Sequence, residues 1–176
     1  SRARSLACPR AGLKQGPRRS RRCLRNAAKG SDSGLMFWDS SALVTALLTS
    51  AHSDQLIEAF DRDPTPAIWW TTPVECRSAV VRAVREKRAT RDEASEAMER
   101  LREARSQTRE VLPVEGVRTR AIRLLAQHPL RAADALQLAA ALVWCEEQPS
   151  SETFVCLDRR LRDAARREGF TLFPPE

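Results

Sequence analysis

The amino-acid sequence predicts an α/β domain built on a mainly parallel sheet. Short apolar runs alternate with longer segments that have helical periodicity, and Pro, Gly or capping residues separate them. Strands that are separated by helices usually pair in parallel, so this alternation is typical of α/β folds. In such sheets, functional sites form beyond the carboxyl ends of the strands.

Five segments are expected to be strands, namely residues 35–38, 67–70, 111–114, 153–157 and 170–173. Asp39 directly follows the first run and Asp158 directly follows the fourth. A charged residue at this point is expected where a buried strand ends at the edge of a sheet. The third is a weak candidate because Pro113 has no N–H to donate to a neighbouring strand.

Seven helices are expected between these strands, covering residues 42–48, 54–61, 73–88, 91–107, 116–127, 132–146 and 159–168. Thr72 and Glu75, and again Thr90 and Glu93, have the spacing of a capping box. Pro73 then falls at the first helical position, which proline favours.

Charge is distributed unevenly along the 176 residues. Residues 1–35 contain ten Lys and Arg and one Asp, a net charge of +9, which leaves residues 36–176 with a net charge of −2. The first segment has few large apolar residues, so we expect a basic, disordered N-terminal extension ahead of a folded domain over residues 36–176. We favour an upstream extension before a natural start at Met36 over a transit-like or RNA-contacting arm.

Two further features bear on where the protein works. No apolar run approaches the roughly 18–20 residues that span a membrane, so we expect a soluble protein. The five cysteines are odd in number and form no CxxC pair, which argues against a disulfide framework or a structural zinc site. Cys145 and Cys156 lie in apolar surroundings and are predicted to be buried, reduced thiols. Reduced thiols are typical of the cytoplasm, so we expect a cytoplasmic protein.

Four acidic residues occupy positions that an α/β fold brings together. Asp39 and Asp158 directly follow apolar strands, Glu75 opens the helix after another strand, and Asp134 lies in the first turn of an apolar helix. The carboxyl ends of parallel strands and the amino ends of the following helices share one edge of the sheet. The four carboxylates are therefore predicted to converge there.

A cluster of carboxylates favours a bound cation because like charges repel one another. Carboxylate oxygens suit Mg²⁺ or Mn²⁺, and such ions can activate water and stabilise charge in an attack on phosphorus. Each acid also has a structural alternative: Glu75 in the capping box, Asp134 at the positive end of the helix dipole, and Asp158 as an N-cap. The prediction depends on all four together.

Other candidates have competing interpretations. The Arg-rich helix over residues 159–168 could contact RNA phosphates or form a solvated face, and the second is favoured because Asp163 and Glu168 are interleaved. Trp69 and Trp70 could stack on bases, but core packing is favoured. The sequence contains no Gly-rich phosphate loop and no GxSxG motif.

Four segments, in this order and spacing, resemble PIN-domain ribonucleases, specifically VapC-type toxins of type II toxin–antitoxin pairs. The resemblance covers about residues 35–174, and its segments are Phe37-Trp38-Asp39-Ser40-Ser41-Ala42-Leu43, Thr72-Pro73-Val74-Glu75, Leu130-Arg131-Ala132-Ala133-Asp134-Ala135-Leu136-Gln137-Leu138-Ala139 and Phe154-Val155-Cys156-Leu157-Asp158-Arg159-Arg160-Leu161. The first and third are the most specific.

This resemblance implies a three-layer α/β/α sandwich and hydrolysis of RNA phosphodiester bonds that depends on Mg²⁺ or Mn²⁺. Asp39 and Asp134 match the family's main metal ligands, Glu75 completes the site and Asp158 is the fourth acid. Ser41 matches a small hydroxyl residue near the metal.

Two positions depart from the family pattern. Cys156 stands where Ser or Thr often precedes the last acid, which makes the role of Asp158 less certain. Gln137 stands where His is common, a change expected to matter little if the position only packs.

The resemblance also implies partners. These are a cognate antitoxin lying in an apolar groove, a second copy in a homodimer, and promoter DNA indirectly through the antitoxin. Such a groove would be lined by Leu43, Leu47, Leu56 and Phe60, although these residues could equally be core.

Our leading hypothesis is therefore an endoribonuclease toxin. The alternative is a catalytically silent PIN-like module that binds RNA or protein. A phosphatase or phospho-acceptor is disfavoured because no DxDxT-like motif follows the first strand and no lysine ends a late strand.

Overall fold

A five-stranded sheet forms the centre of the computed structural model, which describes residues 35–48 and 53–175. The strand order is β3-β2-β1-β4-β5, and every pairing is parallel. The strands are β1 (Met36–Trp38), β2 (Ala67–Trp69), β3 (Arg109–Val111), β4 (Thr153–Val155) and β5 (Thr171–Phe173). The parallel sheet is thus confirmed, while the predicted N-terminal extension lies outside the described residues except for Leu35.

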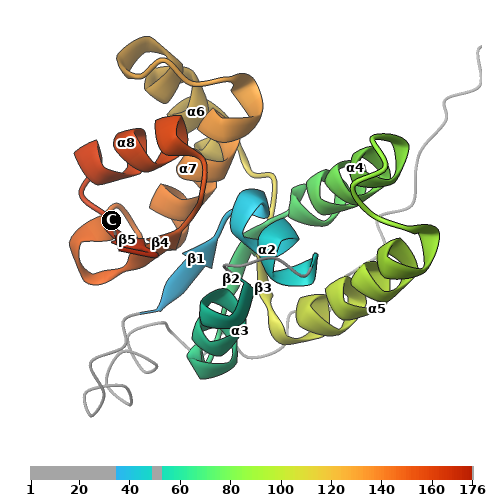
Figure 1. The fold of residues 1–176 in the computed structure, drawn as a ribbon. Helices are drawn as coiled ribbons and strands as arrows, with labels where there is room; N and C mark the ends of the chain where they lie inside the picture. The colour runs from blue at the N-terminus through green and yellow to red at the C-terminus, as the bar shows by residue number, and fades with distance from the viewer. Residues whose placement is uncertain (1–34, 49–52, 176) are drawn as a thin grey trace, which may run out of the picture. The chain divides into compact units, whose positions relative to one another are not determined.

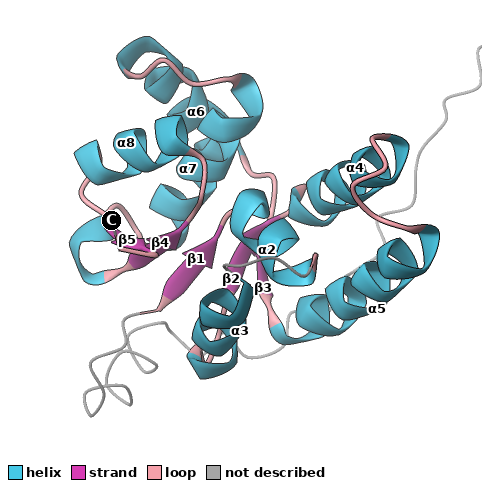
Figure 2. Cartoon of the chain, in the orientation of Figure 1, coloured by secondary structure: helices cyan, strands magenta, loops and turns pink. Residues whose placement is uncertain are grey.

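Helices cover both faces of this sheet (Figure 1). One face carries α2 (Ser40–Leu47), α3 (Ser53–Arg62), α4 (Thr72–Arg85) and α5 (Arg91–Gln107), and the other carries α6 (Glu115–Gln127), α7 (Ala132–Trp144) and α8 (Arg159–Arg167). A short 3₁₀ helix, η1 (Pro149–Ser151), leads into β4. Figure 2 shows the strands enclosed between the two helical layers, which confirms the α/β/α sandwich. None of the described helices is long and apolar enough to cross a membrane.

Successive strand residues alternate between the two cores. Phe37 and Phe154 are paired in register and belong to the core under α6–α8, where their rings stack with centroids 5.6 Å apart. Trp38 and Val155, the next registered pair, belong to the core under α2–α5. Because both faces of β1 and β4 are covered, these two strands carry large apolar side chains on both sides, as their apolar runs predicted.

Two predicted boundaries are wrong. The third strand covers Arg109–Val111 rather than residues 111–114, so Pro113 lies beyond it. At the start of α4, the N-cap is Thr71 and not Thr72, and the Thr71 side chain forms no capping hydrogen bond. Thr72 is fully buried and contacts α7 instead. The second capping box is confirmed, because Thr90 and Glu93 exchange both expected bonds.

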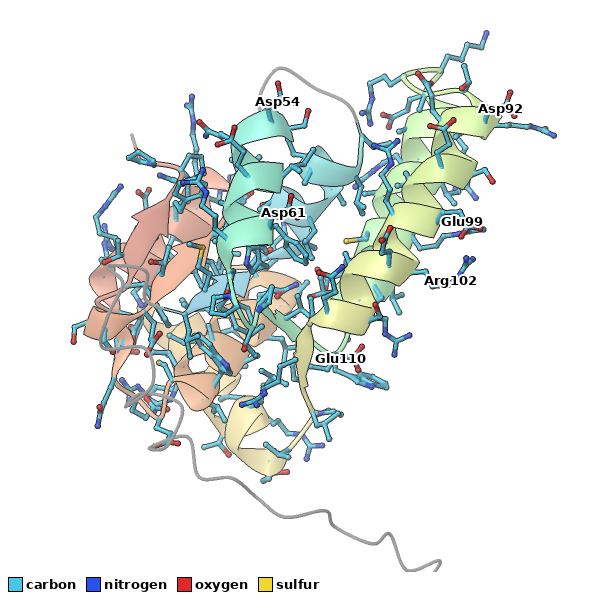
Figure 3. The ribbon with its side chains drawn as sticks, turned by 90° about the horizontal axis from the view of Figure 1, so that it is seen from below. Asp54, Asp61, Asp92, Glu99, Arg102 and Glu110 are labelled. Carbon is cyan, nitrogen blue, oxygen red and sulfur yellow. The ribbon has the colours of Figure 1, made fainter. Side chains whose placement is uncertain are left out.

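Charged and aromatic side chains show where tertiary packing overrides local pattern. On α8, Arg162 is buried and donates to the carbonyls of Cys156 and Pro174, at 2.8 and 2.7 Å. Trp69 is buried as expected, whereas Trp70 is 51% exposed, so the core prediction for Trp70 is wrong. On α5, Glu99 and Arg102 form an ion pair on the outer side of the helix (Figure 3).

Replacing Phe37 with Ala should lower the free energy of unfolding by about 3–5 kcal/mol, because it removes a fully buried ring from the central strand. Urea unfolding followed by circular dichroism measures this change. The matched control is Ile122→Ala on α6, where the side chain is 64% exposed and the expected change is within about 0.5 kcal/mol. Equal effects of the two substitutions would contradict the central position of Phe37.

Candidate active site at the carboxyl edge of the sheet

Asp39 lies where the strand order reverses, between β1 and β4, which is where ligands bind in open α/β sheets. Its backbone N–H donates to the Val155 carbonyl at 2.9 Å, extending the pairing of these two strands. Its side chain caps α2, since Oδ2 accepts from the Ser41 N–H at 2.9 Å. The carboxylate is only 3% exposed, so one group serves as a helix cap and as a buried charge.

Burial raises the pKa of Asp39 to about 6, because a charged carboxylate loses hydration there. Hydrogen bonds from Ser41 oppose the shift, and the charge of Glu75 adds to it. Two acids that are 36 positions apart in the chain are therefore close enough for one to repel the other. This is the convergence that the sequence predicted for Asp39 and Glu75.

Glu75 is held in the first turn of α4 by two neutral donors. Its Oε1 accepts from Thr71 Oγ1 at 2.6 Å, and its Oε2 accepts from Gln137 Nε2 at 2.9 Å. Gln137 is 1% exposed and also donates to Thr72 Oγ1 at 3.2 Å. The position of Gln137 therefore does more than pack, which removes the basis for expecting its identity to matter little.

Sequence reasoning missed the roles of Thr71 and Gln137, although a signal for each was present. Thr71 precedes Glu75 by four residues, and Gln137 follows Asp134 by three. Residues three or four apart lie on one face of a helix. A polar residue on the same face as a candidate site acid, within an otherwise apolar helix, indicates a contact with that site.

Asp134 and Asp158 occupy the amino ends of α7 and α8. Asp134 Oδ2 accepts from the Arg131 N–H at 3.3 Å, and Asp158 caps α8 by accepting from the Leu161 N–H at 2.9 Å. Partial burial raises the pKa of Asp134, and the charges of Asp158 and Glu75 raise it further. Asp134 and Asp158 therefore both stabilise the amino end of a helix, as their structural alternatives required. Their charges also interact, so both acids belong to the carboxylate cluster as well.

Ser41 and Cys156 join Asp39 to the turn after β4. Ser41 Oγ accepts from the Leu157 N–H at 2.9 Å and lies 3.6 Å from Cys156 Sγ. Cys156 Sγ is also 3.6 Å from Asp39 Oδ2. Burial, together with the charge of Asp39, raises the pKa of the Cys156 thiol. It therefore remains a neutral donor to Asp39, as a hydroxyl would be.

The donor set fits a hard divalent cation chemically, since Glu75 repels both Asp39 and Asp134, and Asp158 repels Asp134. A buried polar atom nearby also lacks a partner, because Gln137 Oε1 accepts no hydrogen bond within the described residues. In the described part of the chain, no three His, Cys, Asp or Glu side chains are arranged to hold a metal ion as they stand. The kinds of residue present thus suit a divalent cation. Their side chains would have to rearrange to coordinate it together.

The fold and the acidic edge place this chain among parallel α/β proteins that carry a carboxylate site at the strand ends. The family model of the PIN domain matches residues 36–167. The chain therefore belongs to the PIN-domain family, whose members are typically nucleases and generally bind divalent metal ions. No curated protein matches the chain.

Solved structures share the fold at low sequence identity. A toxin–antitoxin complex from Klebsiella pneumoniae is 19% identical, covering 70% of this chain and 86% of its own, with a TM-score of 0.50. PAE2754 from Pyrobaculum aerophilum is 22% identical over 81% and 92%, with a TM-score of 0.54. FitAcB from Neisseria gonorrhoeae is 16% identical over 80% and 98%, with a TM-score of 0.56.

The substitution Asp39→Asn should stabilise the protein at neutral and higher pH in EDTA. The folded-state pKa of about 6 exceeds the ordinary aspartate value of 3.8, so the folded state binds more protons between these values. Wild-type stability therefore falls as the pH rises through this window. Asn can still cap α2 but carries no charge, so we expect a gain of roughly 1–3 kcal/mol at about pH 8.

Urea unfolding of both proteins at a series of pH values tests this expectation. The gain should shrink as the pH falls from about 6 toward 3.8, and it should disappear below 3.8, where the wild-type carboxyl is protonated in both the folded and the unfolded state. A difference between the two proteins that stays the same at every pH would contradict the buried, repelled carboxylate.

Proposed function

We propose that this PIN-domain protein is a divalent-metal-dependent endoribonuclease and the toxin of a toxin–antitoxin pair. The observation that carries the proposal is the gathering of Asp39, Glu75, Asp134 and Asp158 at one edge of the sheet, where the pKa of Asp39 is raised by burial and by Glu75. Carboxylates without a neutralising partner are costly, and a divalent cation offsets that cost.

In this proposal Asp39, Asp134 and Glu75 hold the ion, and Asp158 assists. A bound Mg²⁺ or Mn²⁺ would supply Lewis acidity toward the phosphate and lower the pKa of water. The contribution of the chain is orientation. Ser41 fixes Asp39 through its backbone N–H, and Thr71 and Gln137 fix Glu75 from both sides. Such supporting contacts commonly tune metal sites.

A protein partner belongs to the same proposal, because one structural neighbour is a toxin–antitoxin complex. A hollow of about 270 Å³ lies between α2, α3 and α5, and it is lined by Leu43, Leu47, Ile57 and Phe60 among others. Leu56, expected there, is fully buried in the core instead. We propose that this hollow receives an apolar segment of the antitoxin.

A homodimer is the remaining partner proposal. Large apolar side chains are exposed around the carboxyl ends of β2 and β3, namely Trp70, Val74, Leu112 and Val114. Exposed apolar side chains that gather in one region mark interaction surfaces, and a second copy of the chain would cover them.

The deciding experiment is incubation of the full chain with total cellular RNA in Mg²⁺ or Mn²⁺. We expect discrete cleavage products that disappear with EDTA. Asp39→Asn should slow cleavage by at least about a hundredfold, because a proposed ligand is lost. Because this variant is expected to be more stable than wild type, a loss of cleavage would come from the missing carboxylate and not from unfolding.

Asp54→Asn is the matched control, since Asp54 is an exposed acid in the first turn of α3 (Figure 3). It should cleave at the wild-type rate. Cleavage that survives Asp39→Asn or EDTA would overturn the metal-dependent assignment.

Gln137→Met should weaken Mn²⁺ binding and slow cleavage about 10- to 100-fold, because Glu75 loses the donor to its Oε2. Met has a similar volume, so the packing of α7 is kept. Gln137→His restores an N–H donor and should recover most of both properties. Calorimetric titration with Mn²⁺ and a cleavage time course measure them. Unchanged Mn²⁺ affinity in Gln137→Met would exclude a positioning role.

A catalytically silent module is the second candidate, favoured by the finding that no three potential ligands in the described part of the chain close around a point. The same calorimetric titration decides between the two. Absence of Mn²⁺ binding by the wild-type chain, together with intact RNA, would support the silent module.

A further inference from the structure

A polar groove leaves the candidate active site along α4. It encloses about 700 Å³ between α2 and α4 and reaches Ala133 at the start of α7. Ser41 and Glu75 line its inner end, and Ser78 and Arg82 line it further along α4. Glu75, Ser78 and Arg82 are spaced three and four residues apart, so they lie on one face of the helix. The groove therefore connects the acidic cluster to a cationic side chain.

Arg82 differs from the other arginine of this groove. Arg88 donates to Glu86 at 2.9 and 2.5 Å, so its charge is already paired. The Arg82 side chain is exposed and forms no hydrogen bond or ion pair with any residue that the structure describes. A guanidinium group presents several N–H donors in a plane and matches the oxygens of a phosphate. Arg82 is therefore available to bind an anion in the groove.

The spacing identifies which phosphate this would be. Arg82 follows Glu75 by seven residues, which is a rise of about 10 Å along a helix. A phosphate at Arg82 is thus not the scissile one, which would lie at the carboxylates. It would belong to a nucleotide further along the same RNA strand. The hydroxyl of Ser78, which is also exposed, lies between the two positions.

We propose that this groove is the path of single-stranded RNA and that Arg82, with Ser78, binds a backbone phosphate next to the scissile one. The proposal rests on the endoribonuclease function and assigns a substrate subsite to it. Val44 and Ala79 supply apolar contact area along the groove, which suits sugar and base faces without selecting a base. Residues 36–176 carry a net charge of −2, so the domain as a whole does not attract RNA. The unpaired charge of Arg82 is therefore expected to contribute substantially to holding the RNA strand in the groove.

The experiment compares Arg82→Ala with Arg85→Ala, both in the full chain carrying Asp39→Asn to prevent cleavage. Arg85 is on the same helix but lines a different hollow, between α4 and α5, and is exposed. Binding of a fluorescein-labelled short oligouridylate is measured by anisotropy in Ca²⁺ over a series of salt concentrations. The basic residues 1–35 are identical in both variants, so their contribution cancels in the comparison.

Arg82→Ala should raise Kd roughly three- to tenfold and reduce the slope of log K against log salt by about 0.7, the loss of one phosphate contact to a single strand. Arg85→Ala should change neither. Equal Kd values for the two variants would overturn the proposal. So would an Arg82-dependent binding of oligoglutamate without an effect on oligouridylate, since the groove would then receive an acidic protein segment.

Cleavage by chains that retain Asp39 separates this proposal from the proposed function. Arg82→Ala should raise KM with little change in kcat, because the contact is made equally in the ground state and the transition state. If wild type cleaves RNA and both arginine variants match it, the groove proposal fails and the nuclease stands. If wild type leaves RNA intact but binds it through Arg82, the nuclease fails and the groove remains an RNA-binding site.

Discussion

The burial of β1 between two strands and two helical layers is the constraint on which the rest of the structure depends. Phe37 and Trp38 face opposite cores and are both fully buried, so the central strand cannot shift by one residue without exposing one of them. The next residue is Asp39, whose N–H continues the pairing with β4. The register of the sheet therefore places a carboxylate at the switch point, out of contact with bulk water.

That placement is costly, and the surroundings of Asp39 only partly relieve it. The donors that reach its carboxylate are the backbone N–H and side chain of Ser41 and the Cys156 thiol, all neutral, while Glu75 adds a repelling charge. Neutral donors fix the direction of a carboxylate but leave its charge uncompensated. A site of this kind gains stability when a cation arrives, which links the energetics of the fold directly to metal binding.

The second carboxylate shows how the helical layers cooperate across the sheet edge. Glu75 comes from α4 on one face, yet its firmest support from outside its own helix is Gln137 on α7, which belongs to the other face. Ser41 performs a similar task by tying α2 to the turn that carries Asp158. The acids are thus not isolated side chains at strand ends. They are joined by contacts that lock α2, α4, α7 and the β4–α8 turn to one another.

Local pattern by itself determined the class of fold, the extents of most helices and the positions of the four acids. Apolar runs, helical periodicity and strand-end carboxylates are read within short windows of the chain, and parallel α/β topology brings strand ends together in a general way. Pattern failed where long-range contacts compete with it. Thr72 contacts Gln137 instead of capping α4, and buried Arg162 donates to two backbone carbonyls. β3 begins two residues earlier than predicted, where Arg109 pairs with Ala67 of β2. Only the tertiary structure decided these three outcomes. It also decided which side chains hold Glu75 and where the groove along α4 runs, because each depends on distances between residues far apart in sequence.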